Sequence, residues 1–188
     1  VQKPGSTNLF YIFTTGSTTF DYSIVDMTLS GGNGDVTSKN VLMHPSSTER
    51  STAVRKPNGI DFWIIGHEIG NNTFFVYELT NSGVSAVPVL SSVGLMQITG
   101  GDEIGYVKAN PDRTKLAMAV RYDNLFEIFD FDNATGIISN AITFPATYPY
   151  SYGVEFSPDG SRLYMSGGLS AAYLYKVDMT APNPAAII

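Results

Sequence analysis

Short apolar runs separated by Pro, Gly and Asn turns make up the pattern of hydrophobic and polar positions along the chain. No stretch longer than a turn places apolar residues at helical spacing between helix caps. The runs are instead rich in Val, Ile, Phe and Tyr, which suit a pleated surface. The pattern therefore predicts an all-β protein of short strands.

Two sequence markers recur along the chain in a common phase. The first is a proline-containing turn, found at Pro4, Pro57, Pro111 and Pro158. The second is an acidic residue between two apolar neighbours, found at Asp26, Glu78, Asp130 and Asp178. Each proline precedes its acidic residue by 19 to 22 residues, which indicates a repeat of about 50 residues. The units are about 1–50, 51–103, 104–150 and 151–188.

Each unit predicts up to four antiparallel strands, which we call a to d. The proline turn joins strands a and b, because Pro fixes φ near −65° and the following Asn, Asp or Gly accepts a positive φ. Strand c carries the acidic marker. The expected ranges are 105–109 and 152–156 for strand a; 9–13, 60–65, 115–120 and 162–165 for strand b; and 39–43, 84–90 and 140–144 for strand d.

Four-stranded units of this length are typical of the blades of a β-propeller. An all-β sandwich is the alternative, but it gives no reason for the markers to repeat. We therefore predict that residues 1–188 form a partial β-propeller of WD-like four-stranded antiparallel blades, with about four blades present as an incomplete arc.

Both ends of the chain fall inside a unit. Only residues 1–3 remain for strand a of the first unit, and only the weak segment 185–188 is available as strand d of the fourth. Exposed strand edges template pairing with other chains. We therefore expect the remainder of a parent propeller, another chain or a second copy to complete the arc. The N-terminus has neither an initiator Met nor an apolar signal core, so we expect the sequence to begin within a longer chain.

Longer stretches carry a resemblance to a known family. The segment 152–164, which contains Ser157-Pro158-Asp159-Gly160, looks like a WD-like blade together with 173–178. With the segments 22–27, 34–37, 66–68 and 129–136, it is similar to the N-terminal propeller of large secreted proteins of gliding bacteria. Those proteins end in a gliding-motility-associated, type B sorting domain for type IX secretion. The resemblance covers essentially the whole chain, although the signal peptide, the first part of the propeller and the sorting domain of that family are missing from it.

The resemblance implies a secreted or cell-surface protein, exported across the outer membrane, with no known enzymatic activity in this region. The composition argues against several classes of partner and site. The formal net charge of −6 opposes binding to the phosphate backbone of a nucleic acid. The absence of a long apolar run argues against membrane insertion. The absence of Cys excludes disulfides and thiolate zinc sites.

Function is expected on the loops opposite the proline turns, because the d-to-a and b-to-c connections of a blade share one face. These loops are 44–50, 66–72, 91–103, 121–124, 146–151 and 166–172. The candidate ligand-binding residues on them are His44, His67, Glu68, Arg121, Asp123, Tyr148 and Tyr150. His and carboxylate side chains are also metal ligands, but acidic loop residues are usually solvated, so we predict neither a metal nor another cofactor.

Tyrosines in the loop 146–151 admit two interpretations. Tyr148 and Tyr150 could stack on sugar rings or peptide, because rigid aromatic side chains supply contact area at low entropic cost. Packing between blades is the interpretation that we favour, and we expect it of Tyr152, which begins a strand.

Catalytic motifs are not recognisable. His67-Glu68 lacks the second His of a zinc protease helix, no Gly-x-Ser-x-Gly elbow is present, and no nucleophile with an orienting base is evident. We therefore predict a non-catalytic extracellular binding or adhesion module, with surface proteins or glycans as partners. One alternative is a passenger or partner bound to the type IX secretion translocon. The other is a propeller enzyme, lactonase or glycan-active.

Overall fold

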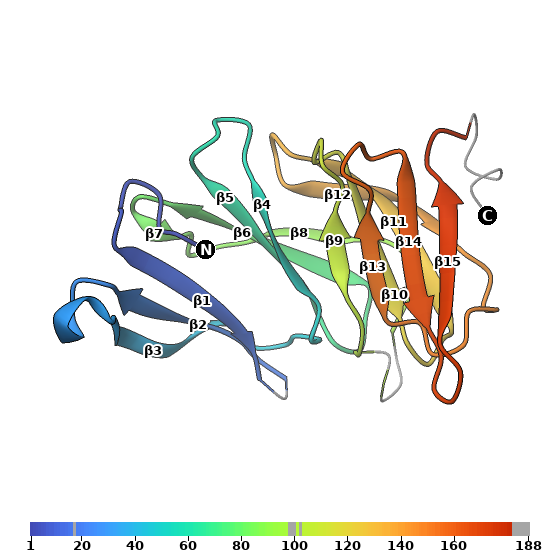
Figure 1. Cartoon of the computed structure of the whole chain (residues 1–188), viewed down its shortest axis with the longest axis horizontal. Helices are drawn as coiled ribbons and strands as arrows, with labels where there is room; N and C mark the ends of the chain where they lie inside the picture. The colour runs from blue at the N-terminus through green and yellow to red at the C-terminus, as the bar shows by residue number, and fades with distance from the viewer. Residues whose placement is uncertain (17, 98–100, 102, 182–188) are drawn as a thin grey trace.

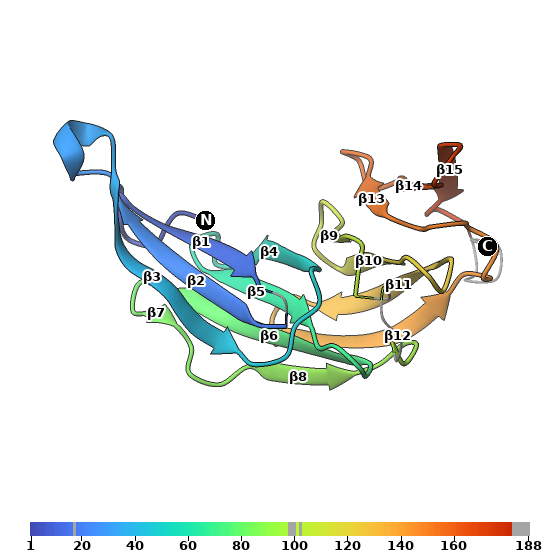
Figure 2. The same ribbon diagram turned by 90° about the horizontal axis from the view of Figure 1, so that it is seen from below.

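The computed structural model describes residues 1–16, 18–97, 101 and 103–181. In these ranges the chain forms fifteen β-strands and one short 3-10 helix, η1 (Ser30–Gly32), and no α-helix. The strands make four antiparallel sheets, each built from one of the predicted units. Figures 1 and 2 show the sheets following one another along an arc, from the N-terminal sheet at one end to the C-terminal sheet at the other.

The first sheet contains β1 (Leu9–Thr15), β2 (Phe20–Asp26) and β3 (Asp35–His44), in that order. Gln2 adds a single antiparallel bridge to Phe10 of β1. The shortened strand a expected before the first proline turn is therefore present as one bridging residue.

The second sheet contains β4 (Ser51–Arg55), β5 (Phe62–His67) and β6 (Thr73–Thr80), and its outer strand is split into β7 (Gly83–Val84) and β8 (Val89–Ser92). The sequence predicts one strand over 84–90. Pro88, which has no backbone N–H, lies in the gap between β7 and β8. In the same gap the Ser85 hydroxyl accepts the Glu78 N–H at 3.0 Å.

The third sheet is complete, with β9 (Val107–Ala109), β10 (Lys115–Val120), β11 (Leu125–Asp132) and β12 (Ile137–Thr143). The fourth contains β13 (Gly153–Phe156), β14 (Arg162–Gly167) and β15 (Tyr173–Asp178). The strand expected at 185–188 lies outside the described residues.

The proline turns have the hairpin geometry that the sequence predicts. In the second sheet the Gly59 N–H donates to the Lys56 carbonyl at 3.0 Å, and in the fourth the Gly160 N–H donates to the Ser157 carbonyl at 2.8 Å. Both glycines have a positive φ, of 72° and 71°. Arg113 takes the same position in the third sheet with a φ of 63°, where a side chain is disfavoured.

The acidic marker pairs with a basic residue beside the proline turn. Lys115 contacts Asp130 directly across β10 and β11, and the Arg162 Nη1 atom lies 2.7 Å from the Asp178 Oδ1 atom across β14 and β15. In the second sheet Glu78 instead pairs with Lys56, which lies before the proline turn. In the third and fourth sheets the second marker therefore closes the open end of the hairpin between strands b and c.

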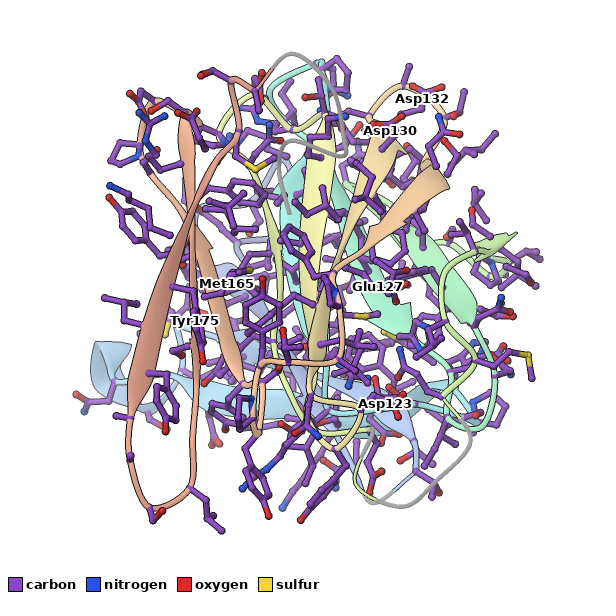
Figure 3. All side chains as sticks on the ribbon, turned by 90° about the vertical axis from the view of Figure 1, so that its right-hand side faces the viewer. Asp123, Glu127, Asp130, Asp132, Met165 and Tyr175 are labelled. Atoms are coloured by element: carbon purple, nitrogen blue, oxygen red, sulfur yellow. The ribbon has the colours of Figure 1, made fainter. Side chains whose placement is uncertain are left out.

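Side chains from consecutive sheets form three hydrophobic cores. Phe20 and Phe75 pack between the first and second sheets, Phe74 and Phe129 between the second and third, and Phe126 packs in the core between the third and fourth. Met165 and Tyr175, labelled in Figure 3, belong to the last of these cores.

Alternation along each strand produces this arrangement. On β10, Leu116 and Met118 face the second sheet, while Ala117 and Ala119 face the fourth. A central sheet therefore uses both of its faces, as the blades of a propeller do.

The outer faces of the two end sheets carry exposed apolar side chains, with Ile12 49% exposed and Leu174 74% exposed. In the part of the chain that the structure describes, no strand of the first sheet pairs with the fourth. The prediction of an all-β, incomplete propeller arc is confirmed. None of the described segments is a helix of the length and apolarity that a membrane crossing requires.

Candidate functional site

A cleft of about 300 Å³ lies at the loop edge opposite the proline turns, between the third and fourth sheets. Its lining comes from the β10–β11 turn, the segment before β13, and the β14–β15 loop with the adjoining ends of both strands. The lining residues are Arg121, Tyr150, Tyr152, Ser166, Gly167, Gly168, Ala172 and Tyr173.

The cleft contains one guanidinium group with aromatic rings around it. The Arg121 Cζ atom lies 5.7, 5.9 and 5.7 Å from the ring centroids of Tyr122, Tyr150 and Tyr152. These separations are within the range of cation–π attraction. The Tyr122 and Tyr150 rings also meet edge to face, with centroids 5.8 Å apart.

Asn124 fixes the loop that carries Tyr150. Its carbonyl accepts the Tyr148 N–H at 2.9 Å, and its side-chain Oδ1 atom accepts the Tyr150 N–H at 2.8 Å. Asn124 and Tyr150 both have a left-handed φ, of 55° and 51°. Non-glycine residues are strained in this region, and such strain clusters at ligand sites.

Small residues form the opposite wall of the cleft. The Gly168 N–H donates to the Pro149 carbonyl at 2.7 Å, which ties the β14–β15 loop to the tyrosine loop. A Cβ atom on Gly167 would lie 2.6 Å from the same carbonyl oxygen, so no larger residue fits at this approach. The two loops are therefore held close to each other.

Tyr148 and Tyr150 have different environments. Tyr148 packs edge to face on Phe126 at 5.5 Å and on Tyr175 at 4.8 Å, inside the core between the third and fourth sheets. Burial raises the pKa of Tyr148. Tyr150, in contrast, lines the cleft.

Tyr152 joins two sheets at the rim. Its ring meets that of Tyr106 edge to face, with centroids 5.2 Å apart, yet 40% of the residue is exposed. The neighbouring Glu49 carboxylate is the main cause that raises the pKa of Tyr152, and burial adds to it.

His44 and Glu68, two further candidates, lie together between the first and second sheets. The His44 Nε2 atom is 2.9 Å from a Glu68 carboxylate oxygen, and the Nδ1 atom is 3.2 Å from the Tyr77 hydroxyl. The imidazole stacks on Phe75 with centroids 4.1 Å apart. Because His44 is only 9% exposed, these contacts join the two sheets rather than offer a surface to a ligand.

His67 is buried between the second and third sheets. Its Nδ1 atom lies 2.7 Å from the Glu68 carbonyl oxygen, and its Nε2 atom lies 3.5 Å from the Gln97 amide nitrogen. Burial, together with the nearby charge of Arg50, lowers the pKa of His67 to about 3. The imidazole is therefore neutral at physiological pH.

Asp123 lies in the β10–β11 turn beside Arg121 and is half-buried (Figure 3). Across the described ranges, no three His, Asp or Glu side chains gather as a metal would require. Of the seven candidates from the sequence, only Arg121 and Tyr150 line the cleft.

A buried polar cluster between the second and third sheets is absent from the sequence-based candidates. Arg50 is fully buried and donates to the carbonyls of Ala119 at 2.7 Å and Ile104 at 2.9 Å, and to the side chain of Gln97. This single residue ties the β3–β4 loop, in which it lies, to β10 and to the β8–β9 loop.

Glu127 is fully buried in the same region (Figure 3). One of its oxygens accepts from the Leu95 N–H at 3.0 Å and the Thr143 hydroxyl at 2.7 Å, whereas the other has no hydrogen-bond partner. Burial raises the pKa of Glu127. The position of Glu127 between Phe126 and Ile128 in β11 was the available sequence signal for this cluster.

The sheets and their order define an incomplete β-propeller with antiparallel blades. No protein-family model matches the sequence, and no curated protein matches it. Similar solved structures include two proteins titled "putative 6-phosphogluconolactonase", from Bacteroides uniformis and Bacteroides fragilis. The first is 12% identical with a TM-score of 0.55, and the second is 14% identical with a TM-score of 0.56.

Hsv2 from Kluyveromyces lactis is a third similar structure, 13% identical with a TM-score of 0.57. The alignments cover 96%, 89% and 94% of this chain but 67%, 52% and 49% of the three solved chains. The chain thus spans from about half to about two thirds of the length of these three solved chains. At such identities the likeness shows the fold alone.

Proposed function

We propose that this chain is a non-catalytic propeller module that binds a ligand in the cleft around Arg121. The observation that supports this function is the cleft itself, in which a guanidinium is surrounded by tyrosine rings. Loops that a rigid scaffold positions are the usual place for binding residues.

The chemistry of the cleft favours binding over catalysis. No His, Asp, Glu or Lys is among the described residues that line it. These are the most frequent general acids and bases of enzymes, and tyrosine, which does line the cleft, serves less often. Both histidines are instead buried between sheets, away from this cleft.

The test is a glycan and protein array probed with the wild-type chain and with Tyr150→Ala and Tyr152→Ala. We expect a ligand whose signal falls at least about tenfold in both variants, because stacking area in the cleft is lost. Tyr164→Ala is the matched control, since Tyr164 is exposed on the fourth sheet but outside the cleft. Wild-type binding by both cleft variants would refute this choice of site.

The proposed setting is extracellular, at the cell surface or secreted through the type IX pathway. Its support is the sequence resemblance to secreted proteins of gliding bacteria. Fractionation of the source cells tests it, with the protein expected outside the outer membrane. Co-purification with translocon components, and no surface ligand, would favour the alternative of a secretion-system passenger or partner.

A second candidate function is a lactonase or glycan-active enzyme. The titles of the two Bacteroides structures favour it, although their identity to this chain is low. Hydrolysis of 6-phosphogluconolactone, lost on Arg121→Ala, would establish this function. If the chain does not hydrolyse this lactone faster than the uncatalysed reaction, the binding module remains the better proposal.

The end sheets are proposed pairing surfaces. Exposed apolar residues on their outer faces, such as Ile12 and Leu174, support pairing with further propeller, another chain or a second copy. Sedimentation measures this directly, because a single chain has a mass of 20.3 kDa. A monodisperse species of that mass at high concentration would exclude self-pairing.

A further inference from the structure

Arg121 lacks the strong side-chain partners that Arg50 and Arg162 have. Arg50 donates to Ala119, Gln97 and Ile104, and Arg162 pairs with Asp178. In the ranges that the structure describes, Arg121 takes part in no ion pair, and its buried Nε atom has no hydrogen-bond partner.

An unpaired guanidinium at a cleft wall has a defined chemical preference. A planar guanidinium presents parallel N–H donors that match the two oxygens of a carboxylate, sulfate or phosphate group. Such a charge-assisted pair is stronger than a hydrogen bond between neutral groups. The cleft therefore favours a ligand with a negative group at Arg121.

Exposed tyrosines gather around this charge. Tyr122, Tyr152 and Tyr173 are between 40% and 49% exposed, and Tyr106, whose ring contacts Tyr152, is 44% exposed. Their rings supply apolar faces, and their hydroxyls supply hydrogen bonds at the rim. A sugar ring needs both, because it has flat C–H faces and hydroxyl groups at its edge.

Hydrogen bonds within the chain hold the tyrosine loop in place. The bonds from Asn124 fix the backbone at Tyr148 and Tyr150, and the buried Ser151 hydroxyl donates to the Tyr148 carbonyl at 2.8 Å. A site whose loop is already ordered loses less conformational entropy on binding. This arrangement is that of a prepared site rather than of a loose surface loop.

We propose that the cleft binds a sugar ring carrying one anionic group, with the anion on Arg121 and the ring against Tyr150 and Tyr152. The inference rests on the proposed binding function and specifies its ligand class. A volume of about 300 Å³ suits one or two sugar rings. A single cation matches a single charge, and the net charge of −6 disfavours a polyanion.

The experiment compares two glycosides that differ only at C6, methyl glucuronide and methyl glucoside, titrated by NMR. We expect the wild type to bind the charged glycoside about tenfold more tightly, and Arg121→Gln to abolish that difference. Tyr150→Ala should weaken both sugars by a similar factor. Arg113→Gln is the control, because Arg113 lies at the opposite, proline-turn edge of the same sheet.

Three outcomes would overturn the inference. In the first, the wild type binds the two glycosides equally tightly or binds neither. In the second, the preference for the charged glycoside survives Arg121→Gln. In the third, sulfate ion alone binds as tightly as the glucuronide. If an array ligand of another class is lost in Tyr150→Ala, the binding function stands and only the ligand class is wrong. If no ligand depends on the cleft, both proposals fail.

Discussion

Replacing Arg50 by Met tests the buried polar cluster between the second and third sheets. The variant keeps the volume and an apolar stem but removes every side-chain donor. It leaves the carbonyls of Ala119 and Ile104 and the Gln97 side chain without the donor that they have in the wild type.

The expected loss follows from these three hydrogen bonds. Bonds from a charged donor contribute about 1.5 to 3 kcal/mol each, and breaking a buried charged network costs about 3 to 5 kcal/mol. A chain of 188 residues shifts its Tm by roughly 2 to 4 °C per kcal/mol. We therefore expect Arg50→Met to lower the Tm by about 6 to 20 °C.

The loss should also depend on pH. The charge of Arg50 favours ionised Glu127 and disfavours protonated His67. Both effects make Arg50 more stabilising at high pH than at low pH. The difference in unfolding free energy between wild type and Arg50→Met should therefore be larger at pH 8 than at pH 5.

Urea denaturation followed by tyrosine and tryptophan fluorescence measures these free energies. Arg55→Met is the matched control, since Arg55 makes an exposed hydrogen bond to the Gly59 carbonyl, and it should cost less than about 1 kcal/mol. If Arg50→Met is no more destabilised than this control, or its penalty is independent of pH, the assignment of Arg50 as the link between these loops is wrong.

Three other variants test the fold. Arg113→Gly should stabilise the chain by about 0.5 to 1 kcal/mol in thermal unfolding, because it relieves a left-handed φ of 63°, and destabilisation would contradict this reasoning. The depressed pKa of His67, about 3 against 6.5 when unfolded, means that stability is lost as pH falls through this window, by up to about 1.4 kcal/mol per unit. His67→Gln should flatten that slope in urea titrations, and an unchanged slope would exclude His67 as its source. The raised pKa of Glu127 acts oppositely, so stability is lost as pH rises above 4.5, and Glu127→Gln should remove this loss; a wild-type pH profile in that variant would contradict it.

The architecture was accessible from sequence because its two markers have local causes. Proline turns depend on a few adjacent residues, and the acidic marker closes the open end of the hairpin between strands b and c through pairs such as Arg162–Asp178. The alternation of side chains along each strand then predicts that a central sheet packs against its neighbours through both of its faces. Strand ends were less accessible, as the split outer strand at Ser85 and Pro88 shows, because side-chain acceptors compete there with the ladder.

The site was only partly accessible for a different reason. The sequence places Arg121 and Tyr150 on the correct edge, but it does not tell which loop side chains turn inward. His44 and Tyr148 lie in cores because the rings of neighbouring sheets, Phe75 and Tyr175, are positioned to receive them. Which loop side chains are buried therefore depends on contacts between neighbouring repeats, and the spacing of the sequence markers does not reveal these contacts.

The cleft around Arg121 is assembled from two blades, and this couples it to the curvature of the arc. Arg121 extends from the third sheet, whereas Tyr152 and Tyr173 belong to the fourth. The angle between these sheets therefore sets the distance between the cation and the far wall. A ligand that fits one angle stabilises that angle, and whatever fixes the angle alters the ligand's affinity by the same factor. If a further blade or chain pairs with the outer face of the fourth sheet and fixes this angle, ligand binding in the cleft and that association are thermodynamically linked.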